Sequence, residues 1–480
     1  MTESSISVSD SYLRQITYPE HVHREVMPLC LVSAMTAVGQ QAPDLSRPYV
    51  YVDLGCGTGL STMVAASCNP MGHFIGVDFN AEQIAQAKNV AQALGLRNIE
   101  FRHSDFMHMA KDASAALPEC DFMVLHGVYS WVAEPVQKAI RQLVERYLCP
   151  GGLFYLSYIS QPGAASFSSA QRFFRMAAQQ EHPAPITEQV HAGIRHLSEL
   201  ARGGAGYFVE HASALREVEQ LAHMSSAYLA HEFLNEHWQA LHSSDVIGQM
   251  NSIGCDYVGS ANLLENVDAF SLPAKLAESF TRWQQAGWPI ESLETARDLA
   301  RNQNQRRDIY QKQAAAFTFS SDQHRKALLS QRMSLSLSAP YAQMLQQAQA
   351  LQLPTRIGTV HVEAALVLPL LMHLQSGECS YAELAALPAY RAQPGLINQL
   401  LQALVHMSYV HFLRPDSQMQ ADSVLNQLDG VLAKAHNDER LFQRLTPASR
   451  AGMAVAVSYP PIGMETQHLR RCKTLGLCTV

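Results

Sequence analysis

A glycine-rich turn follows an apolar run in the segment Tyr49-Val-Tyr-Val-Asp-Leu-Gly-Cys-Gly-Thr-Gly59. Its glycines occupy alternate positions: Gly55, Gly57 and Gly59. Glycines so spaced allow a tight turn with exposed backbone N–H groups, which a ligand can approach where any Cβ would clash. Asp53 precedes the turn, and Asp78 lies at the end of the next apolar run. A carboxylate in the position of Asp78 can bind both hydroxyls of a ribose. These residues therefore predict a nucleoside site.

The elements around these residues alternate between apolar strands and helices. Strands are expected from Tyr49 and at 73–78, 98–102, 121–125 and 153–158, with helices at 60–68, 81–94 and 134–148. This alternation predicts an α/β fold with a doubly wound parallel sheet. Such sheets bind ligands at the carboxyl ends of their strands. Four polar residues fall at those ends: Asp53, Asp78, Asp105 and His126.

The residues after the third strand indicate which base is bound. Asp105 can accept a hydrogen bond from an exocyclic amine such as the adenine N6, and Phe106 can stack on the ring. The ligand implied is an adenosine with a polar tail. Simpler alternatives exist, because Asp is common in loops and a carboxylate such as Asp53 stabilises a nearby helix N-terminus. Either Thr58 or Ser61 is available to cap that helix.

The spacing of the glycines separates two classes of cofactor. Dinucleotide folds use G-x-G-x-x-G, whereas here the third glycine arrives one residue early and an acid precedes the first. This form resembles motif I of class I S-adenosylmethionine methyltransferases, E/D-x-G-x-G-x-G. The resemblance extends to G76-V-D78, to S104-D-F106 and to L148-C-P-G-G152. It implies a Rossmann-like sheet, S-adenosyl-L-methionine as cofactor, and contact of Asp53 with the methionine end of that cofactor.

The segment H126-G-V-Y-S-W-V132 follows the fourth strand, where this class places residues beside the transferred methyl group. The N/D-P-P-Y/F signature of enzymes that methylate base amino groups is absent there. Tyr129 and Trp131, with Tyr158, are expected to wall an acceptor channel, whose dryness would lower the pKa of a lysine acceptor. His126 is expected to touch the methionine portion through its backbone. Ordinary packing is the alternative for Tyr129 and Trp131.

Further segments resemble a bacterial group of methyltransferases that carries a methyltransferase regulatory domain. They are Tyr18-Pro-Glu-His21, 126–132, A230-H-E-F-L-N235 and D256-Y-V-G-S-A-N-L-L-E-N266. Rickettsial protein-lysine methyltransferases that act on an outer-membrane protein are relatives in this group. The resemblance covers residues 12–320 and implies protein lysine side chains as acceptors. A small-molecule O- or N-methyltransferase of secondary metabolism and a non-catalytic cofactor sensor remain alternatives.

The pattern of the chain suggests three regions. Residues 1–165 are expected to form the cofactor-binding core and 166–325 a helical insertion and regulatory region. Within the latter, 243–320 can complete the core sheet, with a sixth strand at 255–259 and a seventh at Ile309-Tyr310 or 316–320. Residues 340–480 are expected to form a winged-helix-like domain, with helices at 361–375, 380–387 and 394–407 and a strand at 409–413.

Composition restricts the partners of the protein. Only 16% of the 480 residues are charged and the net charge is −7, which disfavours a nucleic-acid acceptor. Residues 360–480 hold nine Lys/Arg and nine Asp/Glu, so a protein-interaction or homodimerisation module is favoured there over DNA binding. The nine dispersed cysteines predict reduced thiols in a cytoplasmic protein. No membrane span is expected. No metal site is expected either, because His223, His231 and Glu232 lack a ligand spacing.

Overall fold

The computed structural model describes residues 22–112, 116–313, 320–335 and 350–414, and the strands Leu445–Ala448 (β13) and Met453–Ala456 (β14). Tyr18, His21 and residues 316–319 lie outside these residues, so the expectations placed on them are not addressed by the structure. Among the described residues, no helix is both long enough and apolar enough to cross a membrane.

A seven-stranded sheet organises the first two-thirds of the chain, with the strand order β3-β2-β1-β4-β5-β7-β6. The strands are β1 (Tyr49–Leu54), β2 (Gly72–Asp78), β3 (Ile99–His103), β4 (Cys120–Leu125), β5 (Leu148–Ile159), β6 (Cys255–Ser260) and β7 (Gln305–Lys312). The first five pair in parallel, and β7 runs antiparallel to both β5 and β6. The expected Rossmann-like sheet is therefore confirmed.

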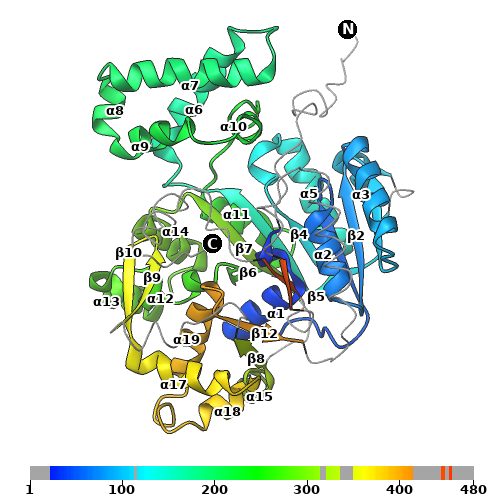
Figure 1. Cartoon of the computed structure of the whole chain (residues 1–480), viewed down its shortest axis with the longest axis vertical. Helices are drawn as coiled ribbons and strands as arrows, with labels where there is room; N and C mark the ends of the chain where they lie inside the picture. The colour runs from blue at the N-terminus through cyan, green and yellow to red at the C-terminus, as the bar shows by residue number, and fades with distance from the viewer. Residues whose placement is uncertain are drawn as a thin grey trace.

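Helices cover both faces of this sheet (Figure 1). Because side chains alternate along a strand, Tyr51 of β1 packs in one core and its neighbour Val52 in the other. The helices around the sheet are α1 (Pro28–Ala37), α2 (Leu60–Cys68), α3 (Ala81–Ala93), α4 (Phe106–Lys111), α5 (Glu134–Tyr147) and α11 (Ser243–Asn251). The core that contains Tyr51 includes α1, α2 and α3, and the core that contains Val52 includes α4, α5 and α11.

A helical insertion follows β5 and projects from the body of the molecule (Figure 1). Its helices are α6 (Ala165–Gln179), α7 (Ile186–Arg202), α8 (Gly206–Glu210), α9 (Ala212–Leu221) and α10 (Ser226–Phe233). Apolar residues at helical spacing give it a core of its own, centred on the fully buried Phe174. These helices lie between β5 and α11 in the chain.

The chain returns to the sheet after the insertion. Helix α11 leads into β6, and a helical excursion separates β6 from β7. This excursion comprises η5 (Leu263–Asn266), α12 (Asp268–Ser271), η6 (Ala274–Leu276), α13 (Ala277–Gln285) and α14 (Ile290–Arg301). Of the two segments that the sequence offered for a seventh strand, the structure has the one around Ile309 and Tyr310.

We expect residues 1–165 to be unable to fold alone. β7 pairs with β5 from Leu153 to Ile159, so its removal would leave an interior strand as an apolar edge. Limited proteolysis of the full chain, with fragments identified by mass, should yield no stable fragment that ends near residue 165. The recovery of such a fragment in folded form would contradict the contribution of β7 to the stability of the sheet.

The C-terminal part packs against the same core as α1 and α2 (Figure 1). Its elements are α15 (Ser321–Ser330), β8 (Arg332–Leu335), β9 (Ala350–Thr355), β10 (Gly358–Glu363), α17 (Ala364–Gln375), β11 (Cys379–Ser380), α18 (Tyr381–Ala385), α19 (Gly395–His406) and β12 (Val410–Leu413). β8 pairs with both β11 and β12, and β9 pairs with β10.

One boundary predicted for the C-terminal part was wrong. The helix expected from His361 begins at Ala364, because residues 361–363 belong to strand β10. Val362 of β10 points into the core, whereas its neighbours His361 and Glu363 are exposed. This alternation of exposed and buried residues is difficult to recognise in the sequence, because an apolar helix follows it directly.

Candidate functional site

The glycine turn has the backbone that its sequence requires. Gly55, Gly57 and Gly59 have φ values of +75°, +57° and +74°, a region that favours glycine. The turn is held to β2, because the N–H groups of Gly55 and Cys56 both donate to the Val77 carbonyl oxygen at 2.7 and 3.1 Å. The loop is therefore fixed by its backbone before any ligand binds.

The three glycines serve different purposes. A Cβ on Gly59 would lie 2.3 Å from Cε1 of Phe101, and one on Gly55 would lie 2.7 Å from Cγ2 of Val128. At Gly57 the nearest atom is Oε1 of Gln83, at 3.7 Å. Gly59 and Gly55 are thus required by packing within the protein, whereas Gly57 leaves room beside the loop for a ligand.

Two carboxylates flank the glycine turn from the ends of neighbouring strands. Oδ2 of Asp53 accepts a hydrogen bond from Oγ1 of Thr62 at 2.6 Å. Oδ2 of Asp78 accepts one from the Gly57 N–H at 2.9 Å, and its Oδ1 accepts one from the Asn80 N–H at 2.8 Å. Both residues are buried. The carboxylate of Asp78 therefore fixes the glycine loop to the end of β2.

The cap expected for the helix after the turn was wrong. The N-cap of α2 is Gly59, which has no side chain to donate or accept. Instead, Oγ of Ser61 accepts a hydrogen bond from the His23 N–H at 3.1 Å. The first turn of α2 is thus tied to a segment that precedes β1 by more than twenty residues.

Burial controls the protonation of both carboxyl groups. It raises the pKa of Asp53 to about 6, with the hydrogen bond from Thr62 opposing this shift and the charge of Asp78 adding to it. Burial also raises the pKa of Asp78, against the hydrogen bonds from the backbone of Asn80 and Gly57. Two desolvated carboxylates at one end of a sheet would be stabilised by a positively charged ligand.

Asp105 and Phe106 lie at the start of α4. Oδ1 of Asp105 accepts hydrogen bonds from the Met107 and His108 N–H groups at 2.8 and 3.1 Å, so Asp105 is the N-cap of this helix. Phe106 is 9% exposed and packs in the same core as Met109. These contacts explain the positions of Asp105 and Phe106 within the fold. Their contact with the adenine stays a prediction.

The aromatic residues expected at the acceptor channel are packed. Tyr129, which opens η4 (Tyr129–Trp131), is fully buried. Its hydroxyl donates to Oε1 of Gln249 at 2.8 Å and accepts from Nη1 of Arg141 at 2.7 Å. The hydroxyl of Tyr158 donates to Oδ2 of Asp308 at 2.8 Å. The contacts of Tyr129 and Tyr158 are those of residues that join helices and strands.

Trp131 lies where the sheet meets the helical insertion. It packs with Ile159 at the end of β5 and Ala164 before α6, and with Trp238 after α10. Trp131 is therefore packed between the end of β5 and the base of the insertion.

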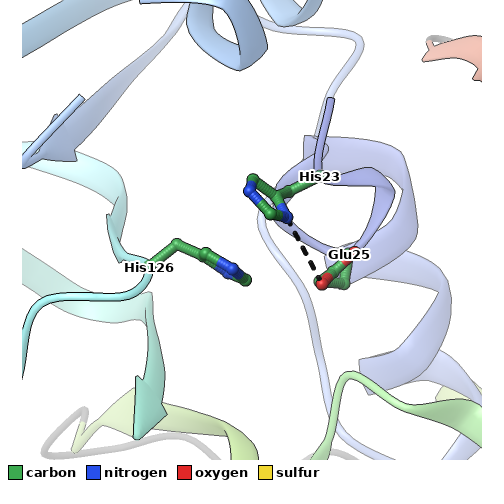
Figure 2. Close-up of side chains that lie close together, drawn as sticks. All are labelled: His23, Glu25 and His126. Atoms are coloured by element: carbon green, nitrogen blue, oxygen red, sulfur yellow. Dashed lines mark ion pairs between the residues drawn. The ribbon is translucent and has the colours of Figure 1, made fainter. Parts of the chain in front are cut away.

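A cluster that sequence reasoning missed surrounds His126 (Figure 2). His23, just before the short helix η2 (Arg24–Val26), stacks its ring on that of His126 with centroids 3.7 Å apart and planes at 28°. Nδ1 of His23 lies 3.9 Å from Oε1 of Glu25. Nδ1 of His126 lies 2.9 Å from the Tyr155 hydroxyl.

Glu25 of this cluster also pairs with Nε of Arg307 from β7, at 3.2 Å. Burial acts to raise the pKa of Glu25. The charges of Arg307, His23 and His126 outweigh burial and hold this pKa well below its usual range. Glu25 is therefore a carboxylate at any physiological pH. The signal available in the sequence was that His23 and Glu25 directly follow the Tyr18–His21 segment.

Comparison with known protein families agrees with this geometry. A family described as "Methyltransferase domain" matches residues 45–238, which contain the glycine turn, both carboxylates and His126. A family described as "Predicted methyltransferase regulatory domain" matches residues 225–312, which contain β6 and β7. The chain is an S-adenosylmethionine-dependent methyltransferase. The predicted regulatory domain is likewise confirmed.

Relatives of this methyltransferase match different shares of its length. An uncharacterized protein of Synechocystis is 28% identical over 411 residues, which are 85% of this chain and 77% of the relative. An uncharacterized protein of Rickettsia prowazekii is 26% identical over 46% of this chain and 41% of its own length. The structure of PKMT2 from Rickettsia typhi in complex with AdoHcy has a TM-score of 0.61 and 20% identity, and covers 83% of this chain and 78% of that one.

The site of this methyltransferase fits S-adenosylmethionine. The fixed glycine loop has room beside Gly57, and the desolvated carboxylates of Asp53 and Asp78 suit a ligand that carries an ammonium and a sulfonium charge. The expected cofactor is therefore supported by the chemistry of these residues as well as by the family match.

Proposed function

We propose that this methyltransferase methylates lysine side chains of proteins. The observation that carries the proposal is the extent of the likeness to PKMT2, which covers 83% of this chain and so reaches well beyond the cofactor-binding sheet. The absence of a base-amino signature after β4 and the low charge of the chain support a protein acceptor over a nucleic acid.

The proposed cofactor contacts follow from the positions of the residues. Asp53 would bind the methionine ammonium group, and Asp78 the ribose hydroxyls. Gly55, Gly57 and Gly59 would place the backbone of the turn beside the cofactor, although their N–H groups donate within the protein and are not exposed as the sequence suggested. Asp105 and Phe106 would contact the adenine, and His126 would contact the methionine portion through its backbone. When bound, the cofactor supplies an electrophilic methyl group on a sulfonium. The chain aligns the acceptor with that methyl group and excludes water.

Tyr129 and Trp131 would support the acceptor site from behind in this proposal. Tyr129 holds η4 to α5 and α11 through Arg141 and Gln249. Trp131 holds the same turn to the base of the insertion. Together they fix the backbone that follows His126, and substrate selection would then depend on the neighbouring helical insertion.

We expect cofactor binding to weaken as the pH falls through the pKa of Asp53. Because burial raises this pKa to about 6, the group is an anion above pH 7 and increasingly protonated below pH 6. A ligand ammonium must then displace a proton, so affinity should fall about tenfold per pH unit below that pKa. Isothermal titration with AdoHcy from pH 5 to 8 measures this dependence.

The control for this measurement is Asp53→Asn, which keeps the size of the side chain and removes its charge. This variant should bind AdoHcy more weakly than the wild type at pH 8 and show a weaker pH dependence in this range, because Asp78, whose pKa burial also raises, remains. A flat profile for the wild-type protein would remove Asp53 from the ligand contacts.

The acceptor is tested by incubating the protein with methyl-labelled S-adenosylmethionine, cell lysate and a pool of small metabolites. Label in protein bands that hydrolyse to methylated lysine supports the proposal. Label in extractable organic compounds supports the alternative, a small-molecule O- or N-methyltransferase. Cofactor binding without transfer to either pool would instead indicate a non-catalytic cofactor sensor.

We propose that the C-terminal part is a winged-helix-like interaction domain, which can also serve in homodimerisation. Its described helices α17, α18 and α19 and the small sheet of order β11-β8-β12 support this assignment. β8 lies before residue 340, where the sequence suggested that this domain begins, so the domain would take its central strand from the preceding segment. The equal numbers of acidic and basic residues in 360–480 support a protein partner.

A further inference from the structure

We propose that the C-terminal part of the chain controls cofactor binding through η2, with Arg24 as the positioning residue of this link. The role concerns the cofactor site of the methyltransferase and holds for any acceptor, so it goes beyond the proposed function. η2 consists of only three residues. A single helical turn of this length has little stability of its own, so its contacts with the rest of the molecule decide where it lies.

Arg24 connects η2 to the C-terminal end of α19. Its Nη1 donates to the Val405 carbonyl oxygen at 3.0 Å and to Oγ of Ser408 at 2.6 Å. Its Nη2 donates to the His406 carbonyl oxygen at 3.1 Å. The last carbonyl oxygens of a helix carry the negative end of the helix dipole, which a cation stabilises. The guanidinium therefore holds η2 to α19 by its charge as well as by the fixed directions of its donors.

The end of α19 is shaped to receive this side chain. Ser408 has a φ of +59°, which is uncommon for residues other than glycine, and such a backbone persists only where its surroundings fix it. The hydrogen bond from Arg24 is one contact that does so. Burial lowers the pKa of His406 to about 4, and the charge of Arg24 adds to this shift. The imidazole at this contact is therefore neutral and does not repel the guanidinium.

The other end of η2 reaches the cofactor site. The N–H of His23, just before η2, donates to Oγ of Ser61 at 3.1 Å, in the first turn of α2 and directly after the glycine turn. The ring of His23 stacks on that of His126, which directly follows β4 (Figure 2). The chain leaves β1 toward β2 but β4 toward β5, so the carboxyl ends of β1 and β4 form the topological switch point where such sheets bind ligands. The start of η2 thus contacts both sides of that point.

Two further contacts join η2 to the sheet. Oε1 of Glu25 lies 3.2 Å from Nε of Arg307 in β7. The hydroxyl of Tyr51, a fully buried residue of β1, donates to the Val26 carbonyl oxygen at 2.9 Å. Arg24 brings α19 into the same set of contacts, because its neighbours in η2 are held by β1 and β7. The position of η2 is therefore set by the sheet and by the C-terminal part together.

A link of this kind acts in both directions. If the contacts with α19 favour the position of η2 in which both sides of the switch point are in place, they raise the affinity for the cofactor. Bound cofactor must then stabilise the contacts with α19 by the same factor. Without Arg24 that position is only partly populated, and a population of about one tenth would raise the apparent dissociation constant about tenfold.

The first test measures AdoHcy binding by isothermal titration to the full-length wild type, Arg24→Gln and Asn398→Ala. Arg24→Gln removes the cation and should bind AdoHcy about tenfold more weakly than the wild type. Asn398→Ala is the matched control, because Nδ2 of Asn398 donates to the Ala37 carbonyl oxygen at 2.8 Å and so joins α19 to α1 without η2. Both variants should melt at lower temperatures than the wild type, but the control should keep the wild-type affinity.

Equal AdoHcy affinities of the wild type and Arg24→Gln would overturn the role of Arg24 and leave the proposed function intact. Equal losses of affinity in Arg24→Gln and Asn398→Ala would overturn it too, because the effect would then follow stability and not η2.

The second test measures amide hydrogen exchange with and without saturating AdoHcy. Bound AdoHcy should slow exchange within residues 395–408 in the wild type and in Asn398→Ala, but not in Arg24→Gln. If Arg24→Gln does not fold, the wild type decides alone, since exchange in this segment that AdoHcy does not slow would overturn the link. Slowing of equal size in the wild type and Arg24→Gln would show that the coupling does not pass through Arg24.

Discussion

Replacing Arg306 with leucine is expected to lower the free energy of unfolding by about 3–5 kcal/mol. Arg306 of β7 is 3% exposed and pairs with three carboxylates at once. Its Nη1 lies 2.6 Å from Asp298, its Nη2 2.9 Å from Glu294 and its Nε 2.9 Å from Asp308. Leucine would leave these carboxylates desolvated without the cation they share.

The effect of Arg306→Leu should depend on pH in a defined direction. Burial raises the pKa of Asp298 to about 6 even while Arg306 opposes that shift. Without the guanidinium, the carboxylates should take up protons more readily in the folded state than in the unfolded state. Protonation of these carboxylates therefore stabilises the folded variant as the pH falls. The difference in free energy of unfolding between the wild type and Arg306→Leu should be smaller at pH 5 than at pH 8.

Urea denaturation, followed by circular dichroism, measures the free energy of unfolding of the wild type and of the variant. Arg195→Leu is the matched control, because Arg195 pairs with Glu181 on the surface with 55% of its side chain exposed. Its loss should cost about 1 kcal/mol or less. Equal stability of the Arg306→Leu and Arg195→Leu variants at pH 8 would mean that the buried network does not stabilise the sheet.

Replacing Asp78 with asparagine is expected to weaken the binding of S-adenosylmethionine about a hundredfold, because one or two hydrogen bonds to a charged acceptor would be lost. Oδ2 of Asp78 accepts from the Gly57 N–H and Oδ1 from the Asn80 N–H. An asparagine amide has one oxygen, so its NH₂ group must face one of these backbone donors. The substitution would therefore both distort the glycine loop and remove a charged hydrogen-bond acceptor from the ribose.

Isothermal titration with S-adenosylmethionine and with AdoHcy checks the effect of Asp78→Asn. Both ligands carry the ribose, so both should weaken by a similar factor. Asp44→Asn, in an exposed turn, is the control and should bind both ligands as the wild type does. An unchanged dissociation constant for Asp78→Asn would show that the ribose binds elsewhere.

Elements whose pattern is local could be predicted from the sequence. β1, the glycine turn and β2 follow from an apolar run, three spaced glycines and a second apolar run, and each requires only neighbouring residues to form. The Rossmann-like order then followed from the alternation of strands and helices. β10 was missed because it runs directly into an apolar helix, and the period of that helix dominated the pattern.

The sequence by itself determined the cofactor, since the residues expected to bind it lie in short motifs at strand ends that any sheet of this order brings together. The tertiary structure alone decided which groups gather beside His126. Glu25, His126 and Arg307 are held together by η2, β4 and β7, and no local pattern links positions so far apart in the chain. It also decided that Tyr129 is packed, because burial depends on α11, which returns to the sheet only after the whole insertion. Contacts between distant segments arise from burial of a shared core, and that core exists only in the folded chain.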